Sequence, residues 1–454
     1  MVLKSFATMI KKIVYFFNSK VLAKQLVLLL LGFFINENLY SQITLNDTLK
    51  LSRQDYEAVF LKQNLLLLAE KFRISEAEAM MAQAKLWPNP TLTLEDVNLW
   101  STQKNRAYLD EPLPRVFGNA AENTQFAIQL EQQIITSGKR KKQIQLEETG
   151  VKIAEQEFQE LLRQLKFDFR NTLTELQYLQ LNEKLFLQQQ QQLDNLLKAY
   201  KRQYENNHIS KGDYLRLQTL KFELTKEINS LAKERNEKEA ALKVFLSINP
   251  EINLEVLEQD FIPDLKKFQD LALYNIQDDV LSQRSDIQLA TLERKYSENQ
   301  LSLEKSQVLP DINLSASYDR GGGIWPSFFG FGVSFELPLF NRNQGAIAAA
   351  KYGIENAALN VNAVQLKAKT EYHQNLKDLQ RAINFYESID PEFEDELDAI
   401  FENYTKNFRN RNISLLQYLD FQEAYLENKK IFLEAQKDIH LHLEILQYTI
   451  GKEI

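Results

Sequence analysis

Hydrophobic and polar residues alternate strictly along residues 311–318. The apolar residues Ile312, Leu314 and Ala316 fall on one side of an extended chain, and Asp, Asn and Ser residues fall on the other. A glycine-rich connection follows, and residues 331–337 then alternate in the same way. Alternation with a period of two on both sides of a glycine-rich turn predicts an antiparallel strand pair with one apolar and one polar face.

Two earlier segments, residues 90–97 and 126–131, repeat this design and predict a second strand pair. The strands of the later pair are about ten residues long, which is the length that crosses a bilayer as part of a barrel. Four strands cannot close a barrel. The pattern therefore predicts that several copies of the chain assemble.

Helical sequence joins the strand pairs. The longest helix is predicted from about Lys139 to about Glu205, which corresponds to roughly 100 Å at 1.5 Å per residue. Its apolar positions are three and four residues apart, as in helices that pack as coiled coils. The other predicted elements are helices at 44–86, 213–245 and 278–308, with an irregular segment at 249–264.

The second half of the chain repeats the first. Trp87-Pro88 matches Leu309-Pro310 at an offset of 222 residues, and the strand at 126–131 matches that at 331–336 at an offset of 205. One difference stands out. Asp390-Pro391 interrupts the second long helix, and proline removes a helical hydrogen bond, so a bend or a side element is expected there.

The predicted organisation begins with a signal peptide at residues 1–41, and the two repeats follow it. Lysines precede an apolar run of about ten residues there, a layout typical of secretory signals, with an uncleaved membrane anchor as the alternative. The remaining predicted parts are the first repeat at 42–248 (hairpin about 90–135, tip about 206–212), a linker at 249–285, and the second repeat at 286–454 (hairpin about 311–340, tip about 410–416).

Composition excludes several functions. The net charge of -8 disfavours nucleic-acid binding, which needs clustered positive charge, and the absence of cysteine excludes disulfides and thiolate metal sites. His440 and His442 diverge around a helix and cannot share a metal ion. No catalytic constellation, metal site or cofactor site is predicted, so the chain is not expected to be an enzyme.

These features resemble the TolC-like family of outer membrane efflux proteins over essentially the whole chain after the signal peptide. The short motifs Trp87-Pro88-Asn89-Pro90, Ser137-Gly138-Lys139-Arg140 and Pro338-Leu339-Phe340 are most similar to the CzcC branch, from cobalt–zinc–cadmium efflux systems. The resemblance implies a mostly α fold with a small β part. Three chains of four strands would form a 12-stranded barrel in the outer membrane of a Gram-negative bacterium, continued by a long periplasmic α-helical barrel.

The same resemblance implies partners and a transport role. A homotrimer in outer-membrane lipid would work with a periplasmic adaptor (a membrane fusion protein) and an inner-membrane pump of the resistance–nodulation–division (RND) type. Heavy-metal cations are the expected substrates. The alternatives are a multidrug outlet or a type I protein-secretion outlet, and a periplasmic adaptor or structural coiled-coil protein is a further rival.

Three groups of candidate site residues follow. In relatives the helix–turn–helix tips meet the adaptor, although the same residues also suit plain turn chemistry, since Ser210 and Ser414 are good helix N-caps. The tip residues are His208, Ile209, Ser210, Asn412, Ile413 and Ser414. On the barrel model, the polar strand residues Glu131, Glu336, Ser315 and Ser317 face the lumen.

The third group is a periplasmic gate. Relatives whose tips close the tunnel carry acidic residues just past the second tip, and Asp420 matches one of them. Gln417 departs from the other acidic position, and its equivalent in the first repeat, Asp213, is a weaker candidate. Three symmetry-related Asp420 carboxylates would form a ring that attracts cations. A solvated surface aspartate is the competing interpretation.

Overall fold

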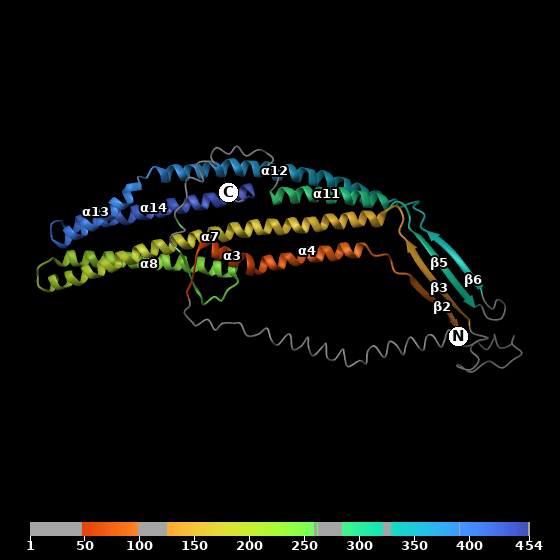
Figure 1. Cartoon of the computed structure of the whole chain (residues 1–454), viewed down its shortest axis with the longest axis horizontal. Coiled ribbons are helices and arrows are strands. Elements are labelled where there is room, and N and C mark those ends of the chain that lie inside the picture. The colour runs from red at the N-terminus through yellow and green to blue at the C-terminus, as the bar shows by residue number, and fades with distance from the viewer. Residues whose placement is uncertain are drawn as a thin grey trace, which may run out of the picture.

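The protein is elongated, with a β-sheet at one end and long helices over the remaining length (Figure 1). The computed structural model describes residues 48–98, 125–257, 261, 284–320, 328–389 and 391–452. The predicted signal peptide and the loops at 99–124 and 321–327 lie outside these residues.

The sheet contains the four predicted strands. They are β2 (Thr91–Asn98), β3 (Gln125–Ile134), β5 (Ile312–Arg320) and β6 (Phe328–Phe335). The strands are antiparallel in the order β2-β3-β5-β6, so the two hairpins join through β3 and β5. The outer edges of β2 and β6 have no partner strand within the described sheet.

The long helical hairpins also follow the prediction. Helix α7 (Lys139–Glu205) returns as α8 (Lys211–Leu246). In the second repeat, α12 (Gln344–Glu387) is followed by α13 (Pro391–Arg409) and α14 (Leu415–Ile450), so the expected break at Pro391 is present. Two shorter helices lead into the sheet, α4 (Leu65–Ala84) into β2 and α11 (Ser285–Ser306) into β5.

Buried side chains form three clusters along the helices. Near the tips, leucines of α7 and α8 pack against aromatic residues of α13 and α14, where Phe401 stacks on Tyr425 with ring centroids 4.1 Å apart. Halfway along, Phe60 stacks on Phe169 at 4.7 Å. A third cluster joins α12 to the end of α14. Packing between helices therefore holds the two repeats together.

Two sequence-based expectations were wrong near the middle of the molecule. The segment expected to be helical from 44 begins as β1 (Thr48–Leu51), and the segment expected to be irregular contains β4 (Asn253–Val256), its parallel partner. Strands of four residues carry too little periodicity to be recognised. The side-chain amide of Gln180 on α7 bonds the Leu254 carbonyl at 2.6 Å and the Val256 amide at 3.0 Å, and so completes the open edge of β4.

The first predicted helix also divides in two. Helix α3 (Arg53–Gln63) ends where Asn64 caps α4 through the Leu67 amide, and Asn64 donates to the Phe245 carbonyl at 2.9 Å. In the second repeat α11 starts at Ser285, and residues 278–283 lie outside the described part. None of the described helices combines the length and the apolar character needed to cross a membrane.

Candidate functional site

The register of the sheet separates the polar and apolar residues into two faces. One row across all four strands is Thr91, Glu131, Ser315 and Gly332, and the next polar row is Thr93, Gln129, Ser317 and Gly330. The row between them is Leu92, Leu130, Ala316 and Phe331. Phe331 is 90% exposed in the single chain, so the apolar face lacks a covering layer within the described residues.

On β6, glycines on the polar face leave space for the serine hydroxyls of β5. A Cβ atom on Gly332 would lie 2.5 Å from the Ser315 hydroxyl oxygen, and one on Gly330 would lie 2.8 Å from that of Ser317. Three of the four predicted lumen residues, Glu131, Ser315 and Ser317, therefore lie on this face. Glu336 directly follows the last residue of β6, and its lumenal position stays a prediction.

The short motifs of the first repeat meet where the sheet joins the helices. The Arg140 guanidinium lies over the Trp87 ring, 4.6 Å from its centroid, and donates to the Lys85 carbonyl. Asp311, at the start of the second hairpin, accepts from the Thr136 amide at 2.9 Å and pairs with the Lys139 ammonium at 2.9 Å. The contacts of Asp311 with Thr136 and Lys139 therefore join the second repeat to the first at this junction.

The two tips have the same backbone geometry. Asn207 and Arg411 occupy the left-handed region with φ of 60° and 65°. The following amides, of His208 and Asn412, bond carbonyls five residues back, at 2.8 and 2.9 Å. This hydrogen-bond pattern is that of a Schellman motif, which satisfies the last carbonyls of a helix. His208 and Asn412 are exposed, whereas Ile209 and Ile413 are half-buried.

The tip serines cap the return helices as predicted. The Ser210 hydroxyl accepts from the Asp213 amide at 3.1 Å, and the Ser414 hydroxyl accepts from the Gln417 amide at 3.3 Å. The Gln417 side chain in turn accepts from the Ser414 amide at 2.9 Å, which completes a capping box. Arg411 links the tips by donating to the Gln203 side chain at 3.1 Å.

The capping interactions distinguish the three gate candidates. Gln417 and Asp213 are both engaged at their own N-caps, since the Asp213 carboxylate accepts from the Ser210 hydroxyl at 2.8 Å. Asp420 is exposed and, among the described residues, has no ion-pair partner. Of the two carboxylates among the three candidates, that of Asp420 is therefore the more available to ions. Its place in a gate stays a prediction.

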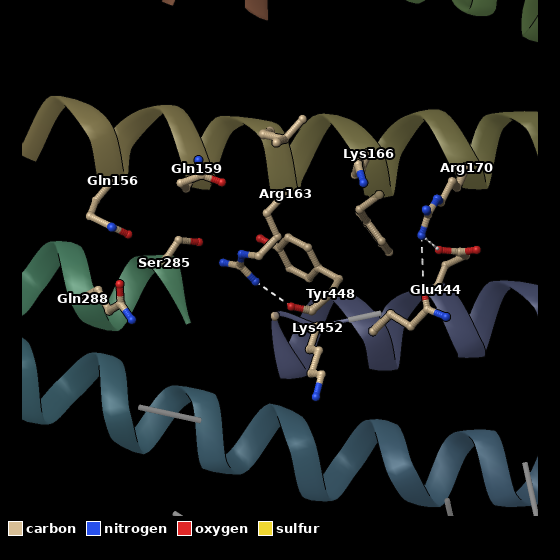
Figure 2. A pocket seen from close by; sticks show the side chains of 14 residues that line it. Gln156, Gln159, Arg163, Lys166, Arg170, Ser285, Gln288, Glu444, Tyr448 and Lys452 are labelled. Atoms are coloured by element: carbon tan, nitrogen blue, oxygen red, sulfur yellow. Dashed lines mark hydrogen bonds and ion pairs between the residues drawn. The ribbon is translucent and has the colours of Figure 1, made fainter. Parts of the chain in front are cut away.

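Sequence reasoning missed a charged pocket of about 310 Å³ between α7, α11 and α14. Figure 2 shows Arg163 and Arg170 reaching from α7 toward Tyr448 and Glu444 of α14. Arg163 lies 4.0 Å from the Tyr448 ring centroid and donates to the Tyr448 carbonyl at 2.6 Å. Arg170 pairs with Glu57 at 2.7 Å and with Glu444 at 3.4 Å.

The charges around this pocket are largely paired with one another. Burial raises the pKa of Glu444, against the nearby Arg170 and Arg53 guanidinium groups, which lower it. Arg284, almost fully buried, pairs with Asp286 at 2.7 Å and donates to the Thr449 carbonyl at 2.8 Å. The network ties the end of the chain to the first repeat, and its sequence signal is only arginine at helical spacing along α7. Within the described ranges no group of three or more His, Asp or Glu residues could hold a metal ion.

Comparisons with known proteins agree with this geometry. Residues 276–452 match the sequence family described as outer membrane efflux protein. The nickel and cobalt resistance protein CnrC of Cupriavidus metallidurans is 30% identical over 88 residues, which is 19% of this chain and 21% of the length of CnrC.

Solved structures match over a longer range. CmeC, the outer membrane channel of Campylobacter jejuni, superposes with a TM-score of 0.69 at 15% identity, covering 88% of this chain and 85% of CmeC. CusC superposes at 0.67 and 15% identity, covering 88% and 92%. The outer membrane protein VceC of Vibrio cholerae superposes at 0.65 and 17% identity, covering 88% and 96%. The predicted resemblance is confirmed to this extent: residues 276–452 match the outer membrane efflux protein family, and the described chain has the TolC-like fold.

Proposed function

We propose that three copies of the chain close a 12-stranded barrel in the outer membrane and that their helices continue it as a passive conduit. The sheet carries this proposal. Its edges at β2 and β6 are open, and its apolar face is bare in the single chain. In lipid, each unpaired edge group costs several kcal/mol. Closure by identical sheets removes both edges and leaves the polar rows facing the lumen.

The tips are the proposed contact with a periplasmic adaptor, and through it with an RND-type inner-membrane pump. Their matching geometry supports this assignment, because a trimer would present six nearly equivalent turns to a partner arranged around the same axis. The exposed His208 and Asn412 are available for such contacts. Photo-crosslinkers at these two positions should capture the adaptor, whereas a crosslinker at exposed Lys295 on α11 should not.

Heavy-metal cations are the proposed substrates, with drugs or secreted proteins as the alternative. The similarity to a nickel and cobalt resistance protein favours metals. The chain would be expressed in a host that has a metal pump and its adaptor but lacks the outer membrane channel. Restored tolerance to cobalt or nickel supports metal export, whereas restored tolerance to drugs alone supports the alternative.

The conduit itself is tested with protein purified from outer membranes in detergent. Mass analysis should give a trimer that separates into single chains only on heating. Insertion into a planar bilayer should give uniform conductance steps. A monomer that stays in solution without detergent would overturn the proposed function.

A further inference from the structure

A pocket of about 750 Å³ lies between the two helical hairpins, in the half of the molecule away from the sheet (Figure 1). Residues of α8 in the first hairpin and of α14 in the second hairpin form its walls, and Phe186 of α7 also lines it. Helix α7 packs against both of these helices. The volume of this cavity, the hairpin pocket, is within the range of small-molecule sites, about 300–1,000 Å³.

Gln422 lines the hairpin pocket with an unsatisfied side-chain amide. The residue is 1% exposed, and neither Nε2 nor Oε1 has a hydrogen-bond partner among the described residues. The equivalent glutamine of the first repeat, Gln218, donates to the Tyr214 hydroxyl at 3.1 Å. Buried polar groups nearly always have partners, so an orphan amide inside a cavity points to a ligand group that bonds it.

The rest of the lining is divided between apolar walls and a charged rim. The apolar residues besides Phe186 are Leu215, Leu220, Leu224, Leu419 and Leu426. The charged residues are Glu223, Glu227, Glu423, Glu427, Arg216 and Lys430. Within the described part of the chain, none of the four carboxylates has an ion-pair or hydrogen-bond partner. Four carboxylates against two basic side chains leave a net charge of -2 around the pocket.

The arrangement of the carboxylates favours an extended cation over a metal ion. Glu223 and Glu427 are equivalent positions of the two repeats, 204 residues apart, so they are equally far from their tips on opposite walls. No group of three or more described His, Asp or Glu residues, these included, could hold a metal ion. Carboxylates spread around an apolar cavity match an organic molecule that carries its positive charges apart from each other.

We propose that the hairpin pocket binds an organic dication with a flat apolar body. The body lies against the leucine and phenylalanine side chains, and the two cationic groups pair with carboxylates of the rim. An N–H group of the ligand donates to Oε1 of Gln422. Because the walls belong to different hairpins, the bound molecule joins them. All the lining residues come from one chain, so this inference is independent of the proposed trimer.

The probe for this site is diamidinophenylindole, a flat fluorescent dication. The dye is titrated with the protein purified in a neutral detergent, with the detergent alone as the blank, and one saturable site per chain is expected. Spermine carries more positive charge but has no flat apolar body, so it should displace the dye only at much higher concentration. The dye should also raise the thermal midpoint, since a ligand that binds only the folded form stabilises it.

Two variants locate the binding. The double change Glu223→Gln with Glu427→Gln removes two exposed carboxylates and should weaken dye binding about tenfold. Gln422→Leu removes the orphan amide and should also weaken binding. Glu237→Gln, which changes an exposed glutamate of α8 outside the pocket, is the matched control and should bind the dye like the unmodified protein. The thermal midpoint of each variant without dye verifies that it is folded.

The outcomes separate this inference from the proposed function. Absence of saturable binding, or equal weakening in Glu237→Gln, would overturn the hairpin pocket as a dication site. Displacement by spermine at the same concentration as by unlabelled diamidine would overturn it too, because charge alone would then explain the binding. A trimer that conducts ions without binding the dye leaves the proposed function intact. A chain that binds the dye but forms no trimer overturns the conduit and leaves the pocket intact.

Discussion

The Lys139 ammonium lies 2.9 Å from the Asp311 carboxylate and joins the first turn of α7 to the start of the second hairpin. Lys139 is buried, and the same carboxylate oxygen accepts from the Thr136 amide at 2.9 Å. A single oxygen atom of this second-repeat side chain therefore accepts from two donors of the first repeat. This junction fixes the sheet against the helices at the position where the chain passes from one to the other.

Asp311→Ala should destabilise the protein, because Lys139 would remain buried without its counter-charge. Removing one partner of a buried pair costs about 3 kcal/mol. The expected result is a lower midpoint for the thermal loss of the folded form in detergent. The matched control is Glu237→Ala, which removes an exposed i,i+4 pair with Lys233 and should cost less than about 0.5 kcal/mol. Equal shifts for the two variants would contradict a stabilising role of Asp311.

His440 should make the fold sensitive to acid. Burial, with the Arg53 charge adding to it, lowers the pKa of His440 from 6.5 to about 4, although its ring nitrogen lies 2.6 Å from the Phe261 carbonyl. The unfolded chain binds this proton more readily than the folded chain. Neutral His440 therefore contributes fully to the free energy of unfolding above pH 6.5, and this contribution is lost as the pH falls toward 4. The full loss corresponds to about 3 kcal/mol.

His440→Gln should flatten this dependence while keeping a donor for the Phe261 carbonyl. Thermal midpoints of both proteins are compared between pH 4.5 and 7.5. The midpoint of the variant should rise relative to that of the unmodified protein as the pH falls. The raised pKa of Glu444 changes stability in the opposite sense, because the contribution of protonated Glu444 to the free energy of unfolding is lost as the pH rises. Glu444 is present in both proteins, so the comparison isolates His440. Parallel curves would remove His440 as the acid-sensitive group.

The sequence predicted the elements that carry a long periodic signal. Helix α7 spans 67 residues of regular apolar spacing, and the strands alternate over eight to ten residues, so both were recognised. The parallel pair of β1 and β4 was missed because each strand has only four residues and its partner is about 200 positions away. Local pattern cannot reveal such a contact.

The candidate site was predicted unevenly for the same reason. The tip serines were identified because capping depends on neighbouring residues, and their bonds to Asp213 and Gln417 are local. The Arg163, Arg170 and Arg284 network was missed because it depends on the end of α14 packing beside α7, which is almost 300 residues earlier in the sequence.

Gln422→Leu should stabilise the contact between the two tip hairpins. Gln422 is 1% exposed and lines a pocket between the two hairpins together with Phe186, Leu224 and Leu426, and neither polar atom of its amide has a hydrogen-bond partner among the described residues. Removing unsatisfied polar atoms at this site should add about 1–2 kcal/mol. The thermal midpoint should rise, and the open time in planar bilayers should fall if the hairpins separate during opening.

The matched control for this change is Gln190→Leu. The Gln190 amide donates to Thr225 at 2.8 Å, so this substitution removes a satisfied hydrogen bond and should not stabilise the protein. A lower midpoint for Gln422→Leu would mean that the amide is satisfied in the assembled channel, which would contradict the prediction.

Asp420→Ala should weaken the interaction of the channel with cations. Three copies of this exposed carboxylate near the tips would form a ring whose field attracts cations and holds trivalent ones most strongly. The variant should show a higher conductance at low voltage or a weaker block by a trivalent cation applied from the tip side.

Asp438→Ala, which changes an exposed aspartate farther along α14, is the control and should leave the block unchanged. Asp213→Ala and Gln417→Ala should have smaller effects on the block, because both side chains are engaged in capping. Identical recordings for Asp420→Ala and the unmodified channel would exclude Asp420 from the gate.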